Sequence, residues 1–160
     1  MAALRDFFIS LSENQTLSNA AQQYGLKLGA QSVVAGTTLE EVIDSIRKLN
    51  EQGISCTVDN LGEYVIDESE ATKAKEDILA MIEAIQVEEL DAHISLKPSK
   101  LGLDIDIDFC YDNLYEIVER AHEYGIFVNF DMEDYDRLQP SFDMLEELSK
   151  SFDNVGTVIQ

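Results

Sequence analysis

The chain has 160 residues, of which 45% are apolar and 27% charged, a composition typical of a globular domain. It carries 32 acidic and 11 basic side chains, for a formal net charge of −21. Because a nucleic-acid binder needs a cationic face, this balance argues against a nucleic-acid partner and predicts a highly soluble surface. The sequence shows neither a run of 18 apolar residues nor a secretory signal, which favours a cytoplasmic protein.

Helical patterns come first along the chain. Thr38 and Glu41 fit a capping box, and the apolar stripe that follows predicts a helix that ends at Gly53. Residues 4–34 predict one or two further helices. The sequence therefore predicts an N-terminal helical section over residues 1–53.

Strands and helices then alternate. Stretches rich in β-branched and aromatic residues predict buried strands over 54–59, 92–97, 126–131 and 155–160. Helical periodicity predicts helices over 69–86, over 109–124 with Gly125 as the capping glycine, and from Pro140 onward with Phe142, Leu145 and Leu148 on the apolar stripe. Cys56 and Cys110 are expected to be buried, reduced thiols.

This alternation requires parallel strands with right-handed crossovers. It fits an open doubly wound sheet, or an α/β fold that is the first half of a (β/α)8 TIM-type barrel over residues 54–160. We favour the half-barrel, because the sequence stops on a strand and a parallel strand needs both faces covered. We also expect such a half to expose two strand edges and to self-associate.

In both architectures the working face is the carboxyl end of the strands. Strand alternation predicts that Lys97 shares a face with His93 and Ser95. Lys97 could hold a carboxylate, form a Schiff base if its pKa is lowered, or be a solvated lysine. Further strand-end candidates are Asp59, Asn60, Glu63, Asp131, Glu133 and Gln160.

Four acids lie within residues 131–136, beginning with Asp131. They could bind a divalent metal, pair with Lys97 or form a polar loop, and a metal is disfavoured because no histidine or second acidic cluster accompanies them. Glu63 follows Gly62, which permits a turn, but alone it is an ordinary loop acid. We expect His93 to be a hydrogen-bonded core residue and His122 to lie on a helix surface. The phosphate-binding glycine patterns are absent.

Together these segments resemble proline dehydrogenase, in its monofunctional bacterial form. The segments that carry the resemblance are 34–36, 58–63, 94–97 with 101–104, 131–135 and 156–160. Each is short, but all five stand in the family's order and at strand ends. Residues 97–99, Lys97-Pro98-Ser99, depart from the family's usual pattern, and we expect the loop that follows them to differ from the family's.

The resemblance implies FAD at the carboxyl ends of the strands and oxidation of L-proline to pyrroline-5-carboxylate by hydride transfer. It implies that Lys97 contacts the proline carboxylate, Asp131 orients Lys97 and helps to bind the flavin, Met132 lines the flavin site, Gln160 bonds the flavin edge, and Glu63 acts as a gate. A quinone would accept the electrons, with the enzyme peripheral to the membrane.

We expect this chain alone to be inactive, since the family's paired arginines and most of its FAD contacts belong to the second half of the barrel. Two alternatives remain open from the sequence: a non-catalytic α/β interaction domain, and a different barrel enzyme that uses Lys97 as its catalytic amine.

Overall fold

The computed structural model describes residues 34–159, so the helices expected over 4–34 and residue Gln160 lie outside the described residues. The described residues divide into two compact units between Ser45 and Ile46, and the domain boundary expected at residue 53 stays a prediction. The elements are α3 (Leu39–Asn50), β1 (Cys56–Asp59), α4 (Glu68–Val87), β2 (Ala92–Leu96), the 3-10 helix η3 (Pro98–Lys100), α5 (Ile107–Glu123), β3 (Val128–Phe130), α6 (Tyr135–Ser149) and β4 (Val155–Thr157).

The four strands form one parallel sheet in the order β1-β2-β3-β4, as expected for part of a barrel. Within the described residues, β1 and β4 each leave one edge unpaired. The strands are shorter than the sequence suggests, and Ile54 precedes β1 with 48% of its surface exposed instead of lying in a buried strand.

Local signals explain where the helices begin and end. Asp67 caps α4 by accepting hydrogen bonds from the backbone of Ser69 and Glu70, and Asp106 caps α5 by accepting from Phe109. Gly125 follows Tyr124, the C-cap residue of α5, and its φ of 68° confirms the predicted capping glycine. The Thr38 hydroxyl accepts a hydrogen bond from the Glu41 amide, as in a capping box. The Glu41 carboxylate, however, accepts from the backbone N–H of Thr37 and not from that of Thr38.

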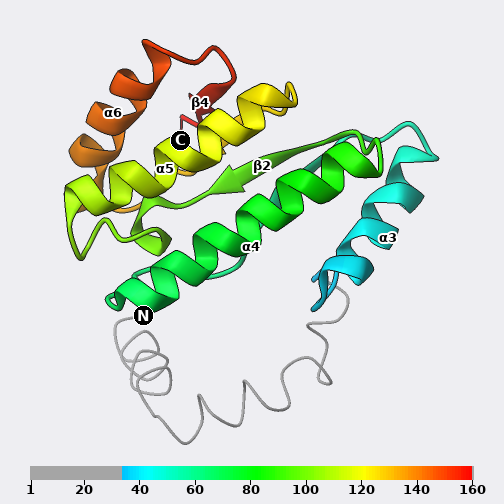
Figure 1. Cartoon of the computed structure of the whole chain (residues 1–160), viewed down its shortest axis with the longest axis horizontal. Coiled ribbons are helices and arrows are strands. Elements are labelled where there is room, and N and C mark those ends of the chain that lie inside the picture. Colours follow the sequence, from blue (N-terminus) through cyan, green and yellow to red (C-terminus); the bar gives the residue numbers. More distant parts are fainter. Residues whose placement is uncertain (1–33, 160) are drawn as a thin grey trace, which may run out of the picture. The chain divides into compact units, whose positions relative to one another are not determined.

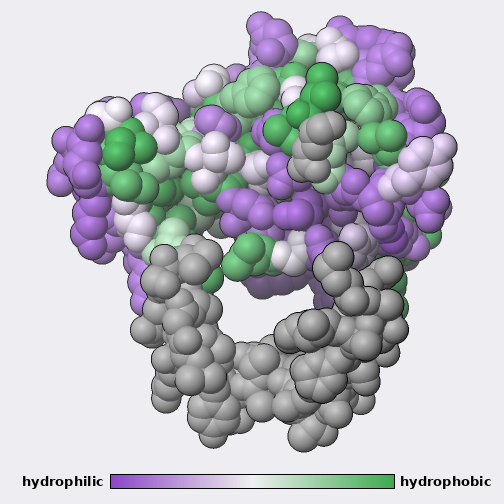
Figure 2. Space-filling model, turned by 180° about the vertical axis from the view of Figure 1, so that it is seen from behind, coloured by the Kyte–Doolittle hydropathy of each residue, from purple (hydrophilic) through white to green (hydrophobic). Residues whose placement is uncertain are grey.

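Helices α4, α5 and α6 cover one face of the sheet (Figure 1). Apolar side chains of β2 and β3 point toward these helices and are at most 2% exposed; they are Ile94, Leu96, Val128 and Phe130. The alternate residues of the same strands point to the opposite face, where polar side chains gather. Seen from behind, the molecule shows hydrophilic residues beside hydrophobic ones on this side (Figure 2).

The start of α6 differs from the prediction. The helix begins at Tyr135, so Pro140 lies inside it and not in its first turn. Proline has no N–H to donate to the carbonyl four residues earlier, so it is usually found in the first helical turn, where no such bond is made. The prediction followed this preference, but Pro140 lies inside the helix. The buried positions of α6 are Ser141, Met144 and Leu148, so the expected apolar stripe is right for Leu148 and wrong for Phe142, which is 37% exposed.

Both cysteines are free thiols. Cys110 is buried in α5, and burial raises the pKa of its thiol to about 12. Cys56 is only half-buried, because it lies on an edge strand, so the expectation of two buried thiols was wrong for one of them.

No helix among residues 34–159 is long and apolar enough to cross a membrane. In the same range, no cluster of three His, Cys, Asp or Glu side chains could hold a metal ion.

The core makes a first stability prediction. Ile82 of α4 has no exposed surface, so Ile82→Ala should lower the free energy of unfolding by about 2–5 kcal/mol through lost burial and a residual cavity. The control is Val87→Ala at the end of the same helix, where 74% of the side chain is exposed and the change should stay within about 0.5 kcal/mol. Urea unfolding measures both, and equal losses would contradict this account of the core.

Candidate active site at the carboxyl ends of the strands

A row of polar side chains crosses the sheet on the face away from the helices. The register pairs Asp59 with Ser95 and Ser95 with Asn129, so these three residues of neighbouring strands share one face. Lys97 and Asp131 follow two residues further along β2 and β3 and extend the same face beyond the strand ends. The expected convergence of strand-end polar groups is confirmed for Lys97, Asp59 and Asp131, and Ser95 shares their face as expected, whereas Asn129 was not among the predicted residues.

Lys97 lies between two carboxylates. Its Nζ donates a hydrogen bond to Asp59 Oδ2 at 3.0 Å and is 3.6 Å from Asp131 Oδ2. The Lys97 side chain is 21% exposed and each aspartate 29% exposed, so the contacts are partly shielded from water. The predicted pairing with Asp131 is therefore present, but the nearer partner is Asp59, whose pairing the sequence did not single out.

The Asp131 carboxylate is held in place by neutral donors. Its Oδ1 accepts a hydrogen bond from Ser95 Oγ at 2.5 Å and another from Asn129 Nδ2 at 3.1 Å. Asn129 Nδ2 also lies 3.1 Å from Ser95 Oγ. These bonds fix one oxygen of Asp131 and leave the other facing Lys97, so the carboxylate has a defined orientation toward the ammonium.

The surroundings keep Lys97 charged. Burial alone lowers the pKa of its ammonium, but the hydrogen bond and charge of Asp59, with the charge of Asp131, outweigh burial and hold the pKa above its ordinary value of 10.5. A lysine that forms a Schiff base needs the opposite shift. The stabilisation from these pairs is thus fully present below the unfolded lysine's pKa and is lost as the pH rises through the higher folded value.

The other expected site residues do not join this cluster. Glu63 lies in the exposed loop between β1 and α4, and among residues 34–159 it makes no hydrogen bond or ion pair with Lys97 or Asp131. Met132 is half-buried directly after Asp131. Gln160 lies outside the described residues.

His122 lies on a helix surface as expected, whereas His93 has the expected hydrogen-bond partner but is half-buried and not part of the core. His93 Nε2 is 2.8 Å from Thr57 Oγ1 and its ring meets Phe127 edge-on, while His122 is 48% exposed on α5.

Sequence reasoning missed how the loops are tied together. Ser99 donates its backbone N–H to Glu133 Oε2 at 3.0 Å, and its hydroxyl bonds the other oxygen of Glu133. Arg137 makes a bidentate pair with Asp104 and lies 4.5 Å above the Tyr64 ring. These pairs join residues that are more than 30 positions apart, and only the acidic cluster at 131–136 hinted at them.

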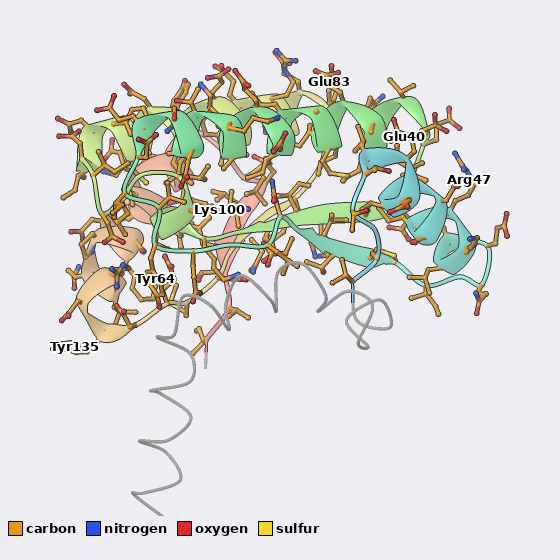
Figure 3. The ribbon with its side chains drawn as sticks, turned by 90° about the horizontal axis from the view of Figure 1, so that it is seen from below. Glu40, Arg47, Tyr64, Glu83, Lys100 and Tyr135 are labelled. Carbon is orange, nitrogen blue, oxygen red and sulfur yellow. The ribbon has the colours of Figure 1, made fainter. Side chains whose placement is uncertain are left out.

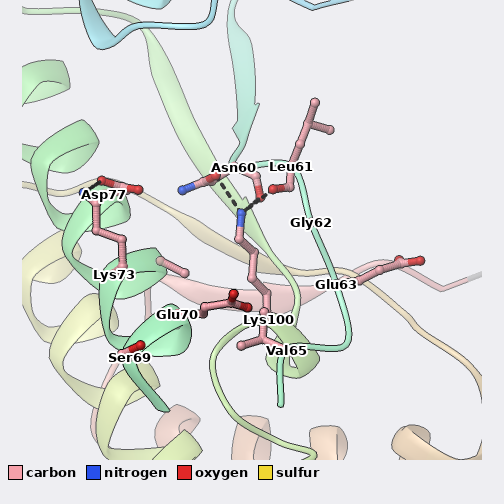
Figure 4. A pocket seen from close by; sticks show the side chains of 11 residues that line it. Asn60, Leu61, Gly62, Glu63, Val65, Ser69, Glu70, Lys73, Asp77 and Lys100 are labelled. Carbon is pink, nitrogen blue, oxygen red and sulfur yellow. Dashed lines mark hydrogen bonds and ion pairs between the residues drawn. The ribbon is translucent and has the colours of Figure 1, made fainter. Parts of the chain in front are cut away.

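A cleft of about 470 Å3 lies between α4 and the β1–α4 loop, and Lys97 is not among its lining residues. Lys100 enters it, and its ammonium donates to Asn60 O and Asn60 Oδ1, each at 2.6 Å, and to Leu61 O (Figure 4). Burial lowers the pKa of Lys100, whose hydrogen-bond acceptors are all neutral oxygens.

The parallel strand order, the sheet face covered by α4, α5 and α6, and the polar strand ends define the first half of a (β/α)8 barrel. Proline utilization A from Bdellovibrio bacteriovorus, in a crystal structure of the protein inactivated by N-propargylglycine, shares this fold: the TM-score is 0.77 at 22% identity, over 90% of this chain and 18% of that one. The fold class expected from the sequence is confirmed.

The chain belongs to the proline dehydrogenase family, whose model matches residues 42–160. Proline dehydrogenase 2 of Bacillus subtilis subsp. natto is 39% identical over 160 residues, which is 100% of this chain and 53% of that protein. Proline dehydrogenase of Deinococcus radiodurans is 30% identical over 161 residues, covering 98% of this chain and 52% of its own length. The chain thus spans about half the length of these relatives.

The charge state of Lys97 can be tested by chemical labelling. We expect acetic anhydride at pH 9 to modify Lys97 more slowly than the exposed Lys48, because the two aspartates keep Lys97 protonated. Asp59→Asn should speed the labelling of Lys97, as measured by peptide mass spectrometry. Asp77→Asn, which removes the partner of the exposed Lys73, is the control and should leave Lys97 unchanged. Equal labelling of Lys97 in all three proteins would show that Asp59 does not hold its proton.

Proposed function

We propose that this chain forms the part of a proline dehydrogenase that binds the carboxylate of L-proline through Lys97. The observation that carries the proposal is the charged, partly shielded Lys97 ammonium at the carboxyl ends of the strands. An ammonium has three N–H donors, and among residues 34–159 Asp59 accepts a hydrogen bond from one of them, while Asp131 lies at an ion-pair distance of 3.6 Å. Lys97 therefore keeps donor capacity for a substrate carboxylate.

In this proposal Asp59 and Asp131 act on the substrate through Lys97. Their carboxylates keep the ammonium protonated, and Ser95 and Asn129 hold Asp131 so that its free oxygen faces Lys97. A fixed cation recognises a carboxylate better than a mobile one, because less rotational freedom is lost on binding. Glu63 is proposed as the gate of the same site.

The cofactor that the proposal requires is FAD. The half-buried, apolar Met132 directly follows the Asp131 carboxylate at the strand ends, and this pair fits the flat apolar rings and the polar edge of a flavin. Met132, Asp131 and Gln160 would hold the flavin. When bound, the flavin supplies the oxidising power by taking a hydride from the substrate. This chain's own residues orient the substrate and keep the charge on Lys97.

The two alternatives are less well supported. A Schiff-base enzyme needs a lysine that loses its proton easily, whereas the contacts of Lys97 raise its pKa. A non-catalytic domain gives no reason for a partly shielded cation held by two carboxylates. The quinone acceptor, peripheral membrane contact and self-association remain predictions from the family resemblance and the open strand edges.

The proposal predicts the effect of Lys97→Ala in the flavin-loaded protein as the cell makes it. Loss of an ionic contact should weaken carboxylate-bearing substrates by about 2–4 kcal/mol, or roughly 30- to 1,000-fold, and leave the flavin content nearly unchanged. Substrate titration and the flavin absorption near about 450 nm measure the two quantities. The control is Lys75→Ala on α4, where a lysine of similar exposure pairs with Glu116 on α5.

Equal substrate affinity in wild type and Lys97→Ala would remove Lys97 from the site. A protein without flavin absorption would refute the cofactor assignment. An imine trapped on Lys97 by borohydride would instead favour the Schiff-base alternative.

A further inference from the structure

The loop between β1 and α4 holds Glu63 between two residues with positive φ. Gly62 has a φ of 130° and Tyr64 a φ of 56°. Tyrosine rarely adopts this backbone conformation, because its Cβ crowds the following carbonyl group. Such strain persists only where neighbouring groups hold the backbone in place. Glu63 itself makes no hydrogen bond or ion pair with residues 34–159, and within that range the groups that hold the backbone act on the residues beside it.

The first anchor precedes Glu63. The Lys100 ammonium donates to both oxygens of Asn60 and to the carbonyl of Leu61, so all three of its donors act on two consecutive loop residues. The Lys100 stem also lies below Gly62, where an added Cβ would meet its Cε at 3.3 Å. Figure 4 shows Lys100 pointing at Asn60 and Leu61 while Glu63 points away from it.

The second anchor follows Glu63. The Tyr64 amide donates to Ser99 Oγ at 3.1 Å, and the Val65 amide donates to Ser99 O at 3.0 Å. The Arg137 guanidinium stacks on the Tyr64 ring at 4.5 Å, a cation–π contact. Figure 3 shows Tyr64 beside the start of α6, the helix that carries Arg137.

The second anchor is itself fixed by the next loop. Glu133 accepts from both the amide and the hydroxyl of Ser99, and Asp104 holds Arg137 through a bidentate pair. The loops after β1, β2 and β3 therefore form one hydrogen-bonded unit. Within residues 34–159, Gly62 and Glu63 are the two residues of the 60–65 loop that make no hydrogen bond of their own.

We propose that Lys100, Ser99 and Arg137 are positioning residues that hold the 60–65 loop on both sides of Glu63 and thereby fix where its carboxylate stands. The proposal rests on the proposed function only in treating Glu63 as a site residue. It assigns the placement of Glu63 to the loops after β2 and β3, and not to contacts of the Glu63 side chain.

Proteolysis tests the anchors without any need for activity. A protease that cuts after glutamate should cleave the wild-type chain slowly after Glu63, and Lys100→Met and Arg137→Gln should each raise this rate by roughly tenfold, because cleavage requires local opening. The matched controls are Lys73→Met, in the same cleft, and Arg120→Gln, an exposed arginine paired with Glu83. Both controls should cleave at the wild-type rate.

Wild-type cleavage rates in Lys100→Met and Arg137→Gln would overturn the proposal. Circular dichroism checks that each variant folds, and the unaltered chain provides a measurement that needs no variant. Hydrogen exchange should show slowed exchange of the Tyr64 and Val65 amides, which donate to Ser99. Exchange of these amides at the rate of an unstructured peptide would also overturn it.

Kinetics of the flavin-loaded protein separate this inference from the proposed function. If Glu63 belongs to the site, Lys100→Met and Glu63→Gln should each raise the KM for proline with little change in kcat. The double variant should then be no worse than Glu63→Gln alone, because both changes remove the same placed carboxylate. If Lys100→Met is cleaved faster but neither Lys100→Met nor Glu63→Gln changes the kinetics, the anchoring of the loop is supported and the role of Glu63 in the site is rejected.

Discussion

The Lys97 ammonium between Asp59 and Asp131 is the interaction on which the site depends. A partly buried cation is costly unless acceptors surround it, and here the acceptors come from the strands on either side. Parallel register makes this arrangement possible, since it places Asp59, Ser95 and Asn129 in one row and Lys97 and Asp131 beyond it. A shift of one residue in any strand would turn its polar side chains into the apolar core.

The same geometry gives the two faces of the sheet different roles. Buried aliphatic side chains pack against α4, α5 and α6 and supply stability, while the strand-end residues on the opposite face are free to be polar. Loops then add a second level of order. Ser99 and Arg137 connect segments that follow three different strands, so the rim of the site is held by side chains and not by secondary structure alone.

Sequence periodicity predicted the order of the elements and the facing of Ile94, Leu96 and Lys97, because alternation along a strand is a local property. The prediction was wrong for the start of α6, because Pro140 lies within that helix, and for the start of β1, because Ile54 is exposed before the strand. At both places tertiary structure outweighed the local sequence preference. The pairing of Lys97 with Asp59 and the contacts of Ser99 and Arg137 depend on which loops meet in space. One sequence carries no direct signal of such meetings, so they required the structure.

The order of the strands has a consequence for how the chain acquires its fold. Among the four described strands, β2, β3 and β4 each pair with the strand that precedes them in the sequence. Pairing of these strands therefore does not depend on a segment that is distant in the sequence. On a ribosome, each helix and strand could dock on the unit already emerged, adding to the sheet as synthesis proceeds. Until a further strand arrives, the growing edge is the segment most in need of protection by a chaperone.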